Sequence, residues 1–438
     1  MDWIAPDPSA SAVSRSTLCA MAHNFPDQTL PSPSAPHSAQ TVEATYDHAG
    51  SAGVTAAPDI IFTFAFTSWS GAAARGFSFP EDRLASALPG HPRVGRVLVC
   101  DPFRGAPRKL AHAALGHRDT PFPASEVAFH HAPVRMRRDD PVDLRSLERT
   151  YAAYERGIHR AAVRHGLTRP AVVTANPLLA GFGDFGWAGP VTYYAWDDWA
   201  AAEPWRRWWP MYAEAFARLR EKRRRVVAVS AGIVSRLAPT GAHAVVPNGI
   251  EESEWQRLPP PPDWFAALPA PRLLYVGSLQ SRIDVQQLRG LAAAFPGGSI
   301  TLVGPLLDPA HFAPLRDIPN IRIHPGVPRS EIRGLIGHAD VGLIPHIRSP
   351  LTEAMSPLKL YEYLAGGLPV AAVDLPAITG VSERVALVPP GADMAPAVRS
   401  ALALGRGAES ERLAFVAQNS WERRFNGLLD VALAGLLF

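Results

Sequence analysis

Residues 356–370 read Ser-Pro-Leu-Lys-Leu-Tyr-Glu-Tyr-Leu-Ala-Gly-Gly-Leu-Pro-Val, and they predict a loop, a helix, a turn and a strand in that order. Ser356 is a favoured N-cap residue and Pro357 suits the first turn, while Gly366-Gly367 ends the helix before an apolar strand. We expect this helix to start at the carboxyl edge of a sheet. Its first backbone N–H groups and its dipole then favour an anion at that edge.

Two charged residues on this helix extend the prediction from an anion to a nucleotide. Lys359 adds a cation in the first turn, and Glu362 lies one turn further, where a carboxylate can accept hydrogen bonds from hydroxyl groups. An anion site beside a hydroxyl acceptor suits a phosphate and a sugar. One alternative is an ordinary amphipathic helix with an exposed Lys359 and Glu362. Another is the Ser-x-x-Lys nucleophile motif of penicillin-binding proteins, whose companion motifs Ser-Asp-Asn and Lys-Thr-Gly do not occur in the chain.

The chain of 438 residues is 47% hydrophobic and 19% charged, which is typical of a globular protein with two or three core domains. The formal net charge of +3 is small and the basic residues are spread along the sequence, so nucleic acid is not an expected partner. Cys19 and Cys100 form neither a disulfide framework nor a metal motif, which suits a reducing cytoplasm. No apolar run approaches the ~18 residues of a membrane span, and no signal peptide is recognisable.

The segment Pro357–Val370 resembles the donor-binding signature of retaining GT-B glycosyltransferases, especially the bacterial enzymes of teichuronic-acid and capsule polysaccharide assembly. The resemblance covers most of residues 58–438 and implies an α/β fold in which two Rossmann-like domains face a central cleft. The chain departs from the family at one position. The earlier glutamate of the family's Glu-x7-Glu spacing falls on Ala354, with Glu353 one residue out of register.

The resemblance also implies which residues bind a nucleotide-sugar donor. Glu362 is implied to hold the ribose hydroxyls, and the backbone N–H groups near Leu358 and Lys359 to hold the diphosphate. The backbone near Gly326 and Val327 is implied to contact the base.

A second part of the donor site is expected after the strand at residues 273–276, which ends in Gly277-Ser278 with Arg282 close behind. Glycine lets the backbone approach a diphosphate, and arginine can neutralise it. The family has a basic residue directly after this glycine; because Ser278 stands there, Arg282 is the expected substitute. The loop over residues 346–355 is implied to approach the donor sugar, although His346 could equally be a solvated loop residue.

The chain divides into five segments by composition and pattern. Residues 1–56 are rich in Pro, Ser, Ala and Thr and are predicted to be a disordered tail. Residues 57–256 are predicted to form an N-terminal Rossmann-like acceptor domain, 257–270 a proline-rich linker, and 271–418 a Rossmann-like donor domain. By resemblance, residues 419–438 form a helix that returns to the N-terminal domain.

The candidate catalytic residues are Asp197 and Asp198, at the carboxyl end of a strand predicted over residues 191–196. Ligands of open α/β sheets bind at such ends. A carboxylate there can contact a hydroxyl group of the acceptor or of the transferred sugar, and Asp197 is preferred for this role. The alternative is that the adjacent acids cap the next helix.

Three further motifs have competing interpretations. Residues 181–186 spell Gly-x-Gly-x-x-Gly, but no well-formed helix follows, so a loop is predicted in place of a dinucleotide site. A helix predicted over residues 214–225 ends in Lys-Arg-Arg-Arg, which either stabilises the helix C-terminus or contacts an anionic membrane surface. The run Val-Pro-Asn-Gly-Ile at 246–250 resembles the family segment that closes the N-terminal domain.

Together these features predict transfer of a sugar, with retention, from a nucleotide-diphosphate sugar to a hydroxyl acceptor in cell-surface polysaccharide or glycolipid assembly. The acceptor is expected to be a glycan, a glycolipid or a small molecule. No metal or cofactor is expected beside the nucleotide sugar as co-substrate, because no tight Asp-x-Asp motif occurs. The expected location is the cytoplasm, with peripheral contact at the inner face of the plasma membrane as a further option. A nucleotide-sugar epimerase and a non-catalytic GT-B-like binding subunit, which Ala354 permits, are the alternatives.

Overall fold

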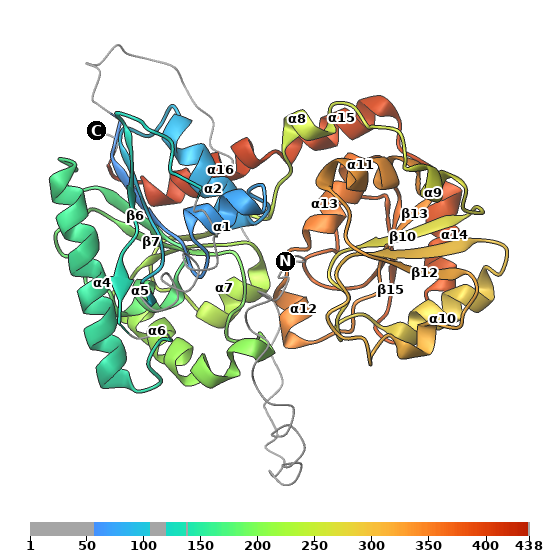
Figure 1. Cartoon of the computed structure of the whole chain (residues 1–438), viewed down its shortest axis with the longest axis horizontal. Coiled ribbons are helices and arrows are strands. Elements are labelled where there is room, and N and C mark those ends of the chain that lie inside the picture. Colours follow the sequence, from blue (N-terminus) through green and yellow to red (C-terminus); the bar gives the residue numbers. More distant parts are fainter. Residues whose placement is uncertain (1–56, 106–119, 137–138, 437–438) are drawn as a thin grey trace, which may run out of the picture. The chain divides into compact units, whose positions relative to one another are not determined.

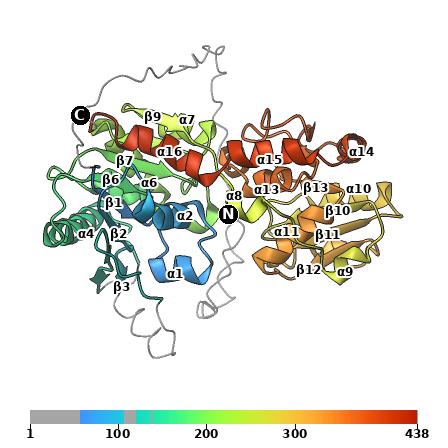
Figure 2. The ribbon, with the colours of Figure 1, turned by 90° about the horizontal axis from the view of Figure 1, so that it is seen from above.

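The computed structural model describes residues 57–105, 120–136 and 139–436. The predicted disordered tail, residues 1–56, lies outside the described residues. Within these ranges the chain forms two large parallel sheets, each flanked by helices (Figure 1, Figure 2). A small parallel sheet pairs β3 (Arg104–Gly105) with β5 (Val134–Arg135). This architecture confirms the predicted α/β class.

The first sheet has seven strands, all paired in parallel with their neighbours. In spatial order they are β4 (Ala128–His131), β2 (Val97–Cys100), β1 (Ile60–Thr63), β6 (Ala171–Thr174), β7 (Val191–Ala195), β8 (Arg225–Ala228) and β9 (His243–Val245). The strand order reverses direction between β1 and β6. Ligands of open α/β sheets bind beyond the carboxyl ends of the strands at such a reversal.

The second sheet has six strands, which are also parallel throughout. Their order is β12 (Ile321–His324), β11 (Ser299–Val303), β10 (Arg272–Val276), β13 (Val341–Ile344), β14 (Val370–Val373) and β15 (Val385–Val388). The order reverses between β10 and β13. The loops that follow these two strands are therefore where a ligand of this sheet is expected.

The apolar composition of the strands explains why helices flank both sheets. Every residue of β1, β2, β6, β13 and β14 is buried, and most of these residues are valine, isoleucine, leucine or alanine. A parallel strand with such a run must be covered on both faces. The covered side chains form two separate hydrophobic cores, one for each sheet.

The α-helices fall into two sets by their position in the chain. Those up to β9, with the last helix of the chain, are α1 (Trp69–Ala74), α2 (Pro80–Ala87), α4 (Leu144–Arg164), α5 (Pro177–Phe182), α6 (Trp209–Glu221), α7 (Ala231–Leu237) and α16 (Trp421–Ala432). The helices that lie between β9 and α16 in the sequence are α8 (Glu252–Trp255), α9 (Asp263–Ala266), α10 (Val285–Ala294), α11 (Arg329–His338), α12 (Pro350–Ala354), α13 (Leu358–Ala365), α14 (Ala395–Leu404) and α15 (Glu409–Gln418). Among the described residues, no helix combines the length and the apolar character that crossing a membrane requires.

The last helix, α16, packs on the first sheet although it follows the second sheet in the sequence. Its Trp421 and Phe425 side chains belong to the first sheet's core, and the helix contacts β6, β7, β8 and β9 (Figure 2). The segment before it runs beside the chain at Ile250, whose N–H donates to the carbonyl of Asn419 at 3.0 Å. The last helix therefore completes the hydrophobic core of the first sheet.

The structure corrects the prediction of a loop over the whole of residues 181–186. Gly181 lies inside α5, and only the residues from Gly183 onward are irregular. A Cβ atom at Gly181 would lie 2.5 Å from the carbonyl oxygen of Ala215 in α6. The glycine therefore permits close packing of two helices and does not mark a nucleotide loop.

Two helix boundaries also differ from the prediction. The helix expected over residues 214–225 is α6, Trp209–Glu221, and the chain leaves it through Arg223, whose φ of 49° is not helical. Ser356 does not cap α13. The N-cap is Pro357, and the Ser356 hydroxyl instead accepts a hydrogen bond from the backbone N–H of Asn248 at 3.3 Å.

Candidate active site

The helix α13 begins at the carboxyl edge of the second sheet, as the sequence predicted, and its Lys359 side chain is directed inward. Lys359 is 1% exposed, and its Nζ lies 4.7 Å from the centre of the Tyr275 ring in β10. The Tyr363 hydroxyl accepts a hydrogen bond from the N–H of Val276 at 2.8 Å, which fixes the helix against the end of β10. These contacts exclude the alternative in which Lys359 is an exposed residue of an ordinary amphipathic helix.

The loop after β10 brings the predicted residues Gly277, Ser278 and Arg282 to the same edge. Gly277 has a φ of 138°, a conformation that favours glycine, and Ser278 is buried. Further along this loop, the carbonyl of Arg282 accepts a hydrogen bond from the N–H of Ile347 at 2.8 Å. The loops that follow β10 and β13 therefore lie side by side.

His346 belongs to the second of these loops. It is 1% exposed, and its ring centre lies 6.2 Å from that of Tyr275. The suggestion of a solvated loop histidine is wrong, because the antiparallel bridge between His346 and Ile283 holds the loop inward. His346 thus joins Lys359 around Tyr275.

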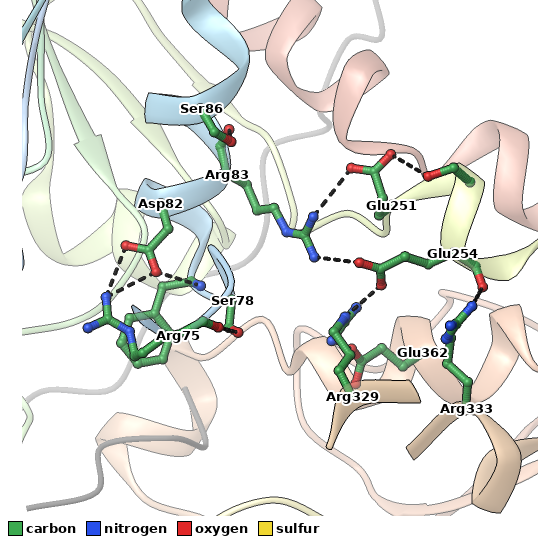
Figure 3. A network of polar contacts seen from close by, with 12 residues as sticks. Arg75, Ser78, Asp82, Arg83, Ser86, Glu251, Glu254, Arg329, Arg333 and Glu362 are labelled. Carbon is green, nitrogen blue, oxygen red and sulfur yellow. Dashed lines mark hydrogen bonds and ion pairs between the residues drawn. The ribbon is translucent and has the colours of Figure 1, made fainter. Parts of the chain in front are cut away.

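Glu362 lies one turn beyond Lys359 and forms an ion pair with Arg329, the first residue of α11. The Arg329 Nη1 atom donates to Glu362 Oε1 at 2.7 Å, and 13% of the Glu362 side chain is exposed (Figure 3). The predicted base-contact residues Gly326 and Val327 lie in the loop just before Arg329. The ion pair therefore ties this loop to the predicted ribose-binding carboxylate.

Asp197 lines a pocket together with residues that directly precede α13. The lining residues are Pro80, Trp196, Asp197, Asn248, Ala354, Met355 and Ser356. Burial raises the pKa of the Asp197 carboxyl to about 7, although the N–H of Asp198 and the positive charge of Arg282 act in the opposite direction. Asp197 is thus the candidate catalytic residue that the fold places beside the residues preceding α13.

Asp198 has a different environment. Its Oδ2 atom lies 3.0 Å from the Nε atom of Arg236 in α7, and its side chain is 4% exposed. Its backbone N–H donates to Asp197 Oδ1 at 2.7 Å. These contacts suit a residue that fixes the loop after β7, and Asp198 does not line the pocket.

Asn248 is a pocket residue whose contacts were not predicted from the sequence. Its Nδ2 atom donates to the carbonyl of Ser356 at 2.6 Å, and its side chain is buried. This bond fixes the orientation of the amide, and the Oδ1 atom then has no hydrogen-bond partner among the described residues. The only sequence signal was the run Val-Pro-Asn-Gly-Ile, where Asn-Gly also marks a simple turn.

Ala354 stands where the family that the sequence resembles has a glutamate, and its side chain belongs to the hydrophobic core of the first sheet. Its carbonyl accepts a hydrogen bond from the Ser230 hydroxyl at 2.5 Å. A Cβ atom at Gly232 would lie 3.2 Å from the Cα atom of Ala354. The end of α12 is therefore held tightly to the start of α7.

The basic run Lys222–Arg225 binds carbonyl groups of the protein itself. Lys222 Nζ donates to the carbonyls of Gly181 and Gly183 at 2.8 and 2.7 Å, and Arg224 also donates to Gly183 at 2.8 Å. Arg225 donates to carbonyls at the end of α16. These contacts favour the structural interpretation of the run over contact with a membrane.

No group of three or more His, Cys, Asp or Glu side chains that could hold a metal ion occurs within residues 57–105, 120–136 and 139–436.

Comparison with known proteins gives one match by sequence and many by structure. No family model matches the chain. A Bacillus subtilis (strain 168) protein described as a teichuronic acid biosynthesis glycosyltransferase, TuaH, is 29% identical over 111 residues. That match spans 25% of this chain and only 28% of the length of the relative.

The matches to solved structures cover nearly the whole length of those structures. A sucrose-phosphate synthase from Thermosynechococcus elongatus superposes with a TM-score of 0.59, 18% identity and coverage of 84% of this chain and 97% of that one. A UDP-forming trehalose-phosphate synthase from Burkholderia xenovorans, in complex with glucose-6-phosphate, superposes with a TM-score of 0.56 and 14% identity, and the match covers 85% of this chain and 100% of that one. The E. coli trehalose-6-phosphate structure bound with UDP-2-fluoro glucose has a TM-score of 0.56 and 14% identity, and the match covers 85% of this chain and 99% of that one. At these identities the likeness shows the fold, and it confirms the predicted GT-B architecture of two Rossmann-like domains.

Proposed function

We propose that this chain is a GT-B glycosyltransferase that moves a sugar from a nucleotide-diphosphate sugar to a hydroxyl acceptor with retention. One observation carries the proposal: the buried Lys359 and the partly buried Glu362 lie one turn apart at the start of α13, at the carboxyl edge of the second sheet. The relative described as a teichuronic acid glycosyltransferase supports it, as does the structural neighbour bound with UDP-2-fluoro glucose.

The diphosphate is proposed to bind at the N-terminus of α13. There the N–H groups of Leu358 and Lys359 lack intrahelical acceptors, and the Lys359 side chain supplies a positive charge. The loop at Gly277 and Ser278 allows close backbone approach, and Arg282 adds a second cation. These groups stabilise the negative charge that grows on the leaving diphosphate as the glycosidic bond breaks.

The nucleoside is proposed to bind between Glu362 and the loop at Gly326 and Val327. The Glu362 carboxylate accepts hydrogen bonds from the ribose hydroxyls, and the loop backbone contacts the base. In retaining enzymes of this type the leaving phosphate guides the acceptor proton, so no covalent nucleophile is required. Asp197 then contacts a hydroxyl group of the acceptor or of the transferred sugar.

The co-substrate is proposed to be the nucleotide sugar alone, with no further cofactor. The acceptor is a glycan, a glycolipid or a small sugar, and the proposed setting is cell-surface polysaccharide assembly in the cytoplasm or at the inner face of the plasma membrane. The structural neighbour in complex with glucose-6-phosphate supports a sugar-type acceptor.

The test is thermal unfolding with a panel of UDP-, GDP-, dTDP- and ADP-sugars. A ligand at 100 times its Kd stabilises the folded state by about 2.7 kcal/mol, which corresponds to a rise of roughly 5–10 °C in Tm. We expect one nucleotide class to produce this rise in the parent protein. Glu362→Gln and Lys359→Met should reduce it, whereas Glu422→Gln, an exposed glutamate on α16, should not.

A turnover assay with the stabilising nucleotide sugar, with and without an acceptor, then separates the alternatives. Release of nucleoside diphosphate only when an acceptor is added supports a transferase, and conversion of the sugar without an acceptor would show an epimerase. Binding without any turnover would support the binding-subunit alternative that Ala354 permits. No stabilisation by any nucleotide sugar would refute the donor site.

A further inference from the structure

A single guanidinium group, that of Arg329, joins two carboxylates from different parts of the chain (Figure 3). Its Nη1 atom donates to Glu362 Oε1 at 2.7 Å, and its Nε atom donates to Glu254 Oε2 at 2.6 Å. Glu254 lies in α8, in the segment that connects the two sheets, and its other oxygen accepts from Arg83 Nη2 at 3.0 Å. The four side chains alternate in charge from α2 to α13.

The position of Arg329 requires an explanation, because a cation at the first residue of a helix faces the positive end of the helix dipole. The two glutamates provide the explanation. Burial alone would lower the pKa of the Arg329 guanidinium, but the charges of Glu362 and Glu254 outweigh burial and raise it. Burial would likewise raise the pKa of Glu254, but Arg329 and Arg83 hold it below its usual range.

The ion pair leaves half of the Glu362 carboxylate open. Arg329 occupies Oε1, and among the described residues no protein donor lies within hydrogen-bond distance of Oε2. The side chain remains 13% exposed, so a ligand can reach it. Glu362 therefore presents one oriented oxygen.

We propose that Arg329 is a positioning residue for the nucleotide-sugar donor. It holds the Glu362 carboxylate in the rotamer that accepts a ribose hydroxyl, and Glu254 fixes Arg329 in turn. This inference rests on the proposed function, because it assumes that Glu362 binds the donor. Immobilising a glutamate side chain before the ligand arrives removes an ordering cost equivalent to roughly two- to ten-fold in affinity.

The experiment measures donor affinity by titration calorimetry, using the nucleotide sugar that stabilises the parent protein. Arg329→Ala should weaken binding by roughly two- to ten-fold. Arg329→Lys should recover part of the loss, because lysine keeps the charge but cannot bridge both carboxylates. Arg333→Ala is the matched control. Arg333 lies on the same helix and donates to the backbone carbonyl of Glu254, but it does not contact Glu362.

A double-mutant cycle separates positioning from a general structural role. If Arg329 acts through Glu362, then Arg329→Ala should have little further effect on affinity once Glu362→Gln is present. Equal weakening in both backgrounds would overturn the inference, as would unchanged affinity in Arg329→Ala or an equal loss in Arg333→Ala. Tm values measured without ligand identify variants that are destabilised. If Arg329→Ala is destabilised, the affinity of Arg329→Lys for the nucleotide sugar is used in its place.

The parent protein serves as the test of the underlying function. If it binds no nucleotide sugar, both the proposed function and this inference fail. If it binds and the Arg329 variants bind equally well, only the inference fails.

Discussion

Two substitutions of Asn248 should change stability by very different amounts, and the difference can be worked out from one hydrogen bond. In the parent protein Nδ2 donates to the buried carbonyl of Ser356 at 2.6 Å, while Oδ1 has no partner among the described residues. Asn248→Ala leaves the carbonyl without its donor, at a cost of about 1–3 kcal/mol, but also removes the unsatisfied Oδ1, a gain of about 1–3 kcal/mol. The two terms oppose each other, so the net change should stay within about 1 kcal/mol.

Asn248→Asp replaces the donor with a second acceptor and retains an unsatisfied oxygen. We expect a loss of about 3 kcal/mol at pH 8, or roughly 6–12 °C in Tm, because an ionised carboxylate then faces the Ser356 carbonyl. The loss should shrink toward pH 4. The introduced carboxyl group can donate only when protonated, so its pKa in the folded state is raised, and the stability it provides is lost as the pH increases through that pKa.

The assay is thermal unfolding of the three proteins between pH 4 and pH 8, without ligand. If Asn248→Ala lowers the stability as much as Asn248→Asp does, the Asn248 Oδ1 atom accepts a hydrogen bond in solution and the reasoning is refuted. Equal stability of Asn248→Asp and the parent at pH 8 would show that the amide orientation described for Asn248 is wrong.

Two further outcomes follow from burial and from close packing. Asp197→Asn should match the parent in stability near pH 4 and exceed it at pH 8 by about 4 kcal/mol. The reason is that burial raises the pKa of Asp197 from 3.8 to about 7, so the folded state loses stability as the carboxyl ionises. Thermal unfolding at both pH values checks this, and a difference that does not change with pH would contradict it. Gly181→Ala should lower stability by about 1–3 kcal/mol, because its Cβ atom would lie 2.5 Å from the Ala215 carbonyl oxygen. The control Gly290→Ala, in an open position on α10, should be neutral or stabilising by up to about 1 kcal/mol. Thermal denaturation measures both variants, and an unchanged stability in Gly181→Ala would refute the packing argument.

The sequence was sufficient to predict the parts of the molecule that depend on local pattern. Apolar runs such as residues 60–63 and 97–100 read as buried strands because both faces of a parallel sheet are covered. The start of α13, with Lys359 and Glu362 one turn apart, follows from helical periodicity. The local pattern alone therefore places the proposed donor-binding helix at a sheet edge.

The partners of these residues could not be predicted, because they depend on distances between segments far apart in the sequence. Arg329 lies 33 residues from Glu362, and nothing in either local pattern links them. Its unfavourable place at the start of a helix was the one available signal. Similarly, Asn248 and Ser356 are separated by 108 residues, and a sequence reading of Asn-Gly indicates only a turn.

The packing of α16 on the first sheet has a consequence for the order of events during protein synthesis. Domains of nascent chains generally fold as they emerge, N-terminal domain first. Here the core around β1 and β6 also requires Trp421 and Phe425, which are translated after the whole second sheet. Until α16 emerges from the ribosome, the first-made sheet therefore still exposes the apolar surface that Trp421 and Phe425 cover, while the later-made sheet already has all of its strands.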